Sequence, residues 1–253
     1  MRVLIGCERS GIVRDEFLAL GHEAYSCDLV PSERPGPHII DDVRNVIHFG
    51  WDLAIFFPDC TYLAGSGLHW NKRRVERAKL TEEALEFVRL LLNAPIARIA
   101  LENPVGCIST RIRKPDQIIQ PWMFGDDASK ATCLWLKNLP PLVPTNVLPG
   151  GRAARRANQT PSGQNKLGPS PTRHIDRART YPGPARAMAQ QWGVAGASAE
   201  TPSHIVAQQM REVAANQGTV GTSELLVWAD MLERNRAKEA NTERRAKPES
   251  EPK

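Results

Sequence analysis

Residues 52–60 read Asp-Leu-Ala-Ile-Phe-Phe-Pro-Asp-Cys, and this stretch decides the fold class. The apolar run Asp52–Phe57 has no polar alternation, which is typical of a strand buried on both faces of a parallel sheet. Pro58 ends the run, and Cys60 follows two residues later. Ligands of doubly wound α/β folds bind at the carboxyl ends of the strands, so this thiol is a candidate nucleophile. The alternative is a buried core cysteine, the commoner state of a free thiol.

The flanking sequence repeats the pattern of short apolar runs separated by helical periodicity. Strands are predicted at Arg2–Cys7, Glu23–Leu29, about Ile39 and Arg98–Leu101, and helices at Gly11–Leu20, Val75–Leu92 and Pro182–Trp192. Strands joined by helical crossovers indicate an α/β fold, a Rossmann-like, doubly wound, mostly parallel sheet with helices on both faces.

The periodicity weakens between residues 105 and 180, where Cys133–Leu136 is the only strand we predict. We expect this loop-rich region to lie over the carboxyl edge of the sheet and to recognise the substrate. The catalytic domain is predicted to span residues 1–197. Residues 198–253 are expected to form two helices, at 203–213 and 222–237, and a charged, disordered tail from 238.

Composition excludes several classes of protein. The chain has 253 residues, a net charge of +5 and five scattered cysteines without a Cys-x-x-Cys pair, so neither a disulfide framework nor a metal site is expected. No apolar run is long enough to span a membrane, and the N-terminus leads directly into a strand, which favours the cytoplasm. Residues 152–179 carry seven basic side chains against Asp176 alone, and could either bind phosphates or be merely solvated.

Acidic side chains follow several predicted strands. The turn Gly6-Cys-Glu8-Arg-Ser10-Gly11 follows the first strand, and Asp28 ends the second, where an acid can accept the hydroxyls of a ribose. Asp42 follows the third and Glu102 the fifth. The alternatives are a capped turn, a solvated aspartate and, for Glu102, the cap of a helix beyond Pro104.

The order of these motifs resembles the cytosine-5 DNA methyltransferases, most closely the compact proteins of phages and prophages. The similarity covers about residues 1–193. It is carried by Cys7-Glu-Arg-Ser-Gly11, Cys27-Asp-Leu29, Pro58-Asp-Cys60 with Thr61-Tyr-Leu63, Glu102-Asn-Pro104, Gln120-Pro-Trp-Met-Phe-Gly125, Lys130-Ala-Thr-Cys-Leu-Trp-Leu-Lys137, Arg179-Thr-Tyr-Pro-Gly183 and Ala187-Met-Ala-Gln-Gln-Trp-Gly193.

The resemblance implies a class I methyltransferase fold and an activity in DNA modification, such as restriction-modification, in a bacterial host. Cys60 matches the nucleophile that adds to carbon 6 of a flipped cytosine, and Glu102 the group that polarises N3. The cofactor implied is S-adenosylmethionine, held by Glu8, Ser10, Gly11, Asp28, Asp42 and Pro58. We expect a monomer whose partner is DNA, with no metal and no membrane.

Asp59 departs from the family, which has a second proline there. A carboxylate beside Cys60 is expected to raise the pKa of the thiol and lower the reactive thiolate fraction. The second catalytic arginine of the larger enzymes has no single match, and Arg111, Arg113, Arg173, Arg177 and Arg179 all stay open. Competing interpretations are a degenerate methyltransferase that binds DNA or cofactor without catalysis, an exocyclic-amine DNA methyltransferase, and a nicotinamide dehydrogenase.

Overall fold

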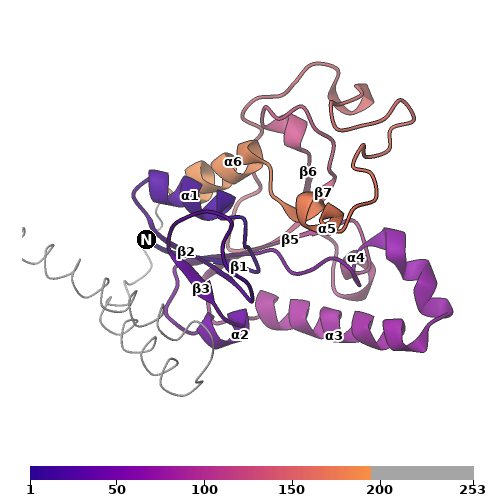
Figure 1. Cartoon of the computed structure of the whole chain (residues 1–253). Coiled ribbons are helices and arrows are strands. Elements are labelled where there is room, and N and C mark those ends of the chain that lie inside the picture. Colours follow the sequence, from indigo (N-terminus) through magenta and orange to yellow (C-terminus); the bar gives the residue numbers. More distant parts are fainter. Residues whose placement is uncertain (195–253) are drawn as a thin grey trace, which may run out of the picture.

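The computed structural model describes residues 1–194 and contains a seven-stranded, mostly parallel sheet between two layers of helices (Figure 1). Its order is β3-β2-β1-β4-β5-β7-β6. The strands are β1 Arg2–Gly6, β2 Glu23–Asp28, β3 His38–Ile40, β4 Leu53–Phe56, β5 Arg98–Pro104, β6 Gln117–Ile119 and β7 Thr132–Lys137. Only β7 runs antiparallel to its neighbours, β5 and β6. The arrangement is the Rossmann order 3-2-1-4-5-6 with one antiparallel strand inserted, which confirms the predicted α/β class.

Helices cover both faces of the sheet, as predicted. The main ones are α1 Ile12–Ala19, α2 Val43–Val46, α3 Val75–Leu92 and α6 Pro182–Trp192. The side chains of α1 and α6 pack with alternate residues of β1 and β4 in one buried cluster, and those of α2 and α3 pack in the other. β1 and β4 are therefore buried throughout, which explains their uninterrupted apolar sequences.

β5 corrects one boundary, because it continues to Pro104 instead of ending at Leu101. Its parallel pairing with β4 stops at the pair Phe56 and Leu101, whereas its antiparallel pairing with β7 continues to Thr132. A terminal proline is compatible with this register because Pro104 is the last strand residue. Glu102 consequently lies inside a strand on the β7 side, and just beyond the end of β4 on the other.

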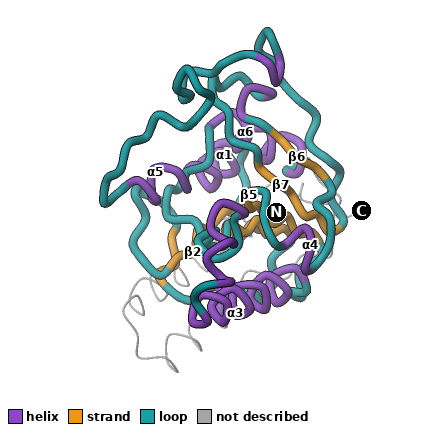
Figure 2. The backbone as a smooth tube through the Cα atoms, turned by 90° about the vertical axis from the view of Figure 1, so that its right-hand side faces the viewer, coloured by secondary structure: helices purple, strands orange, loops and turns teal. Residues whose placement is uncertain are grey.

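Residues 105–180 consist mainly of loops (Figure 2). The short helical turns of this region are α4 Ile108–Arg111, η2 Pro121–Met123, η3 Gly151–Ala153 and α5 Arg173–Ala178. One further turn, η1 Gly65–Lys72, lies earlier in the chain. The prediction missed β6, a three-residue edge strand in which Ile118 is half exposed. A strand of this length is too short to show an apolar pattern in the sequence. The helices expected at 203–213 and 222–237, the tail from 238 and the boundary at 197 lie outside the described residues.

Residues 1–194 lack two features. In this part of the chain no helix is both long and apolar enough to cross a membrane. The same residues contain no group of three or more His, Cys, Asp or Glu side chains that could hold a metal ion.

Candidate active site

Cys60 lies half-buried in the loop that follows β4. Its carbonyl oxygen accepts hydrogen bonds from the backbone N–H groups of Leu63, at 3.1 Å, and Ala64, at 2.9 Å, which turn the chain sharply. The buried Asn103 side chain of β5 donates from Nδ2 to the carbonyl oxygen of Pro58 at 2.8 Å. The loop is thus tied both to itself and to the neighbouring strand.

Asp59 has a structural task that its sequence position did not reveal. One oxygen of its exposed carboxylate accepts from the backbone N–H of Thr61, at 3.0 Å, and from its hydroxyl, at 2.8 Å. This is an Asx turn, in which a short acidic side chain replaces a backbone turn contact. The carboxylate therefore stiffens the loop where a proline would do so by ring closure.

The surroundings of Cys60 raise the pKa of its thiol, chiefly through burial and further through the negative charges of Asp59 and Glu102. The cation of Lys130 opposes that rise. The expected effect of Asp59 thus has the predicted direction, but burial contributes more. The thiolate is the minor form at neutral pH.

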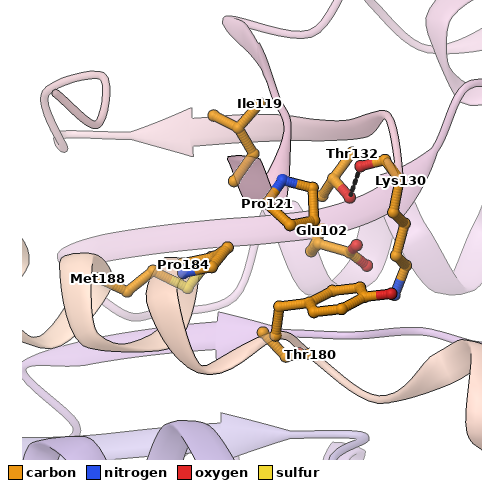
Figure 3. A pocket seen from close by; sticks show the side chains of 9 residues that line it. Glu102, Ile119, Pro121, Lys130, Thr132, Thr180, Pro184 and Met188 are labelled. Carbon is orange, nitrogen blue, oxygen red and sulfur yellow. Dashed lines mark hydrogen bonds between the residues drawn. The ribbon is translucent and has the colours of Figure 1, made fainter. Parts of the chain in front are cut away.

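Glu102 belongs to a compact pocket that Figure 3 shows in close view. Burial raises the pKa of its carboxyl, while the charge of Lys130 and a hydrogen bond with the Thr132 side chain oppose that rise. The pocket holds about 290 Å³ of space, its open mouth included, and is lined by Glu102, Ile119, Pro121, Lys130, Thr132, Thr180, Tyr181, Pro184 and Met188. Glu102 does not cap the next helix, because α4 begins at Ile108, has Cys107 as its N-cap residue and lacks a side-chain cap.

Lys130 is a candidate site residue to which the sequence analysis assigned no role. Of the five arginines considered, Arg111 pairs with Glu82 and Arg179 with Glu33, whereas Lys130 is the cation that acts on both Cys60 and Glu102. Its ammonium group donates to the carbonyl oxygens of Ala178, at 3.3 Å, and Arg179, at 3.2 Å. Lys130 opens the Lys130–Lys137 motif that carries the family resemblance, and that place was the signal for it in the sequence.

Glu8, Ser10 and Gly11 form the turn between β1 and α1. Glu8 is 5% exposed, and its Oε1 accepts from the Ser10 hydroxyl and from the backbone N–H of Ile12. Its Oε2 is buried without a hydrogen-bond partner among the described residues, and burial raises the pKa of the carboxyl. Gly11 has a φ of 72°, and a Cβ there would approach an Nη atom of Arg14 to 2.6 Å. The turn therefore requires glycine and presents an unsatisfied acceptor.

Asp28 and Asp42 follow the next two strands, but their environments differ. Asp28 ends β2, and burial raises the pKa of its carboxyl. Asp42 caps α2 by accepting from the backbone N–H of Arg44 at 2.9 Å, and its pairing with the Arg44 side chain lowers its pKa. The neighbouring Asp41 has a buried Oδ2 with no partner in the described structure. Asp41 is therefore a freer hydrogen-bond acceptor than Asp42.

Cys7 lies close to acidic side chains from three separate segments of the chain. It is the residue after β1, with a left-handed φ of 58°, and is partly buried. Burial raises the pKa of its thiol, and the charges of Asp28, Asp42 and Asp59 raise it further. All three carboxylates are thus within electrostatic range of one sulfur atom, which places Asp28, Asp42 and Asp59 near the end of β1.

Asn103 provides a test of the loop anchor. We expect Asn103→Ala to lower the free energy of unfolding by about 1–3 kcal/mol, because it leaves the Pro58 carbonyl oxygen without its donor. Urea unfolding measures the change. The matched control is Asn93→Ala, since Asn93 also donates from Nδ2 to a carbonyl oxygen, at 2.8 Å, but on an exposed helix end. Equal losses in the two variants would contradict an anchoring role for Asn103.

Comparison with solved structures shows distant similarities, one of which is to a protein from a prophage. A crystal structure described as a candidate DNA modification methyltransferase, encoded within an E. coli prophage, matches with a TM-score of 0.39 and 13% identity. The match covers 60% of this chain and 53% of that one, so the chain spans about half the length of that protein. No protein-family model matches the sequence, and no curated protein matches it.

Proposed function

We propose that this chain is a DNA cytosine-5 methyltransferase that uses S-adenosylmethionine, with Cys60 as nucleophile and Glu102 as the acid that polarises the base. The observation that carries the proposal is the partly buried Glu102 carboxyl, whose pKa is raised by burial, within electrostatic range of the Cys60 thiol. An antiparallel strand inserted next to the last parallel strand is also typical of the class I methyltransferase fold that the sequence resemblance implies.

The two residues divide one chemical problem between them. Carbon 5 of cytosine is inert until a nucleophile adds to carbon 6, and that addition places negative charge on the ring. The Cys60 thiolate forms the new sulfur–carbon bond, and protonated Glu102 donates its hydrogen to N3, where the charge develops. The Thr132 hydroxyl donates to the Lys130 carbonyl oxygen at 3.1 Å, and the contact of its side chain with Glu102 lowers the pKa of that carboxyl, which partly opposes the effect of burial.

Residues at the other strand ends fit the cofactor. Glu8 offers a buried, unpaired oxygen suited to an ammonium group, and the left-handed Gly11 allows close approach of the backbone. Asp28 suits ribose hydroxyls, and Asp42 or its neighbour Asp41 suits an exocyclic amine. When bound, S-adenosylmethionine supplies an electrophilic methyl group. Pro58 is assigned to the boundary between the cofactor region and the loop that contains Cys60.

The test is base-resolution sequencing of DNA from cells that express the full chain, with nucleoside mass analysis. We expect 5-methylcytosine at one short sequence and none in cells without the gene. N4-methylcytosine or N6-methyladenine instead would establish methylation of an exocyclic amine. Cofactor binding by calorimetry without any methylated base would establish the non-catalytic alternative, which the raised pKa of Cys60 favours.

The reactivity of Cys60 can be measured apart from methyl transfer. We expect Asp59→Asn to move the pH midpoint of Cys60 alkylation downward, because the amide keeps an oxygen for Thr61 but removes a negative charge. Lys130→Met should move the midpoint upward, because it removes the opposing cation. Iodoacetamide labelling read peptide by peptide separates Cys60 from the other four cysteines. Shifts of the same sign in both variants would contradict these assignments.

A further inference from the structure

The segment between the nucleophile loop and α3 carries an exposed set of cations arranged on an aromatic ring. We call the side chains of Trp70, Lys72, Arg73 and Arg74 the 70–74 strip; all four are exposed. The guanidinium carbons of Arg74 and Arg73 lie 5.0 and 5.9 Å from the centre of the Trp70 ring, which is itself 39% exposed. Glu76 is the one acidic residue between Thr61 and Thr81.

These cations are uncommitted, unlike several in the basic run at 152–179. Within residues 1–194, the side chains of Lys72, Arg73 and Arg74 form neither an ion pair nor a hydrogen bond. By contrast, Arg156 is buried against the Trp122 ring, and Arg179 is paired with both Glu33 and Asp176. A guanidinium stacked on an aromatic face keeps its N–H donors free in its own plane, where they can grip a phosphate in bidentate fashion.

The helix that follows the strip is hydrogen-bonded to the loop that contains Cys60. Arg77, on the first turn of α3, donates from Nη2 to the carbonyl oxygen of Thr61 at 2.6 Å, and its guanidinium lies 4.9 Å from the centre of the Tyr62 ring. The Thr81 hydroxyl lies 3.2 Å from the carbonyl oxygen of Tyr62. The beginning of α3 therefore holds the two residues that follow the nucleophile, and its unpaired N–H groups add to the positive potential there.

The segment that leads into the strip lies beside the loop after β5. Figure 1 shows the beginning of α3 on the same side of the molecule as α4. Backbone hydrogen bonds from Gly65 to Val105 and from Cys107 to Leu63 join this segment to the loop after β5. Since β5 carries Glu102, these bonds tie the segment that leads into the strip to the strand of the proposed active site.

We infer that the 70–74 strip binds the phosphate backbone of duplex DNA and thereby positions the duplex next to Cys60. This inference rests on the proposed function and adds the surface that holds the substrate. It also assigns this role to the strip instead of to the basic run at 152–179, which the sequence alone made the candidate. Neutralised phosphates release counterions, so the affinity of such a surface depends steeply on salt.

The experiment measures binding of the full chain to a fluorescein-labelled duplex of about 30 base pairs over a series of salt concentrations. We expect the double variant Arg73→Ala, Arg74→Ala to bind more weakly and to reduce the slope of log K against log salt by about 0.9 per charge. Arg89→Ala is the control, because it removes one guanidinium group from the other end of α3, where Arg89 is paired with Glu86. It should leave the slope unchanged.

Trp70→Ala separates the ring from the charges. It should weaken binding while leaving the slope near that of the wild type, because the number of cations is unchanged. Circular dichroism and cofactor binding check that each variant is folded. A wild-type slope in the double variant would overturn the inference and leave the proposed function standing. Absence of DNA binding by the wild-type chain would overturn both.

Discussion

Replacing Cys60 with serine is expected to abolish methyl transfer to DNA, by more than about 10³-fold, without weakening the binding of S-adenosylmethionine. The change substitutes one atom, and the hydrogen bonds that shape the loop use the backbone oxygen of residue 60, so the loop should keep its form. The serine hydroxyl, however, does not ionise in the range where even a thiol of raised pKa does. Methyl incorporation into duplex DNA measures the loss of transfer, and calorimetry with the cofactor measures the binding of S-adenosylmethionine.

A covalent trap makes the same prediction in a different way. DNA with fluorine on carbon 5 of the target cytosine cannot lose a proton there, so a sulfur adduct on carbon 6 should persist after methyl transfer. We expect a denaturation-resistant protein–DNA complex for the wild type and for the control variant Cys107→Ser. This control changes another cysteine, at the N-cap position of α4, where serine is a favourable residue. The Cys60→Ser variant should give none. Wild-type transfer by Cys60→Ser would show that the mechanism is not covalent.

The parts of the fold that were predictable have strong local signals. The helices Val75–Leu92 and Pro182–Trp192 have their predicted bounds, because apolar side chains recur at helical spacing along each. β4 was predictable because burial on both faces leaves four consecutive apolar residues, Leu53–Phe56. The strand ends that follow from these elements then placed Cys60, Asp28 and Asp42 at one edge of the sheet.

The parts that were not predictable depend on pairing between distant segments. Lys130 and Thr132 reach Glu102 only because β7 inserts antiparallel beside β5, and no local pattern specifies that register. The link from Asn103 to Pro58 likewise depends on how two strands align. Asp59 was read from its charge alone, whereas its turn with Thr61 depends on the conformation of the loop.

Glu102→Ala is expected to lower methyl transfer by about 10²–10⁴-fold, and Glu102→Gln by less, because the amide still offers an N–H donor to N3. Both should bind the cofactor normally, since the cofactor residues lie on other strands. Initial rates at saturating cofactor and DNA measure the effect. Equal losses in the two variants would indicate that a proton, and not merely a hydrogen-bond donor, is required at residue 102.

The pH dependence distinguishes the acid from a structural carboxylate. Activity requires a protonated Glu102 and an ionised Cys60, and burial raises the pKa of both groups from ordinary values of which that of a thiol is the higher. Below the pKa of Glu102 the rate should rise tenfold per pH unit with the thiolate. Between the two pKa values the gain in thiolate and the loss of protonated Glu102 cancel, so the rate should be level. Glutamine does not titrate, so in Glu102→Gln the rate should keep rising up to the pKa of Cys60. A level region that survives in Glu102→Gln would show that another group supplies the proton.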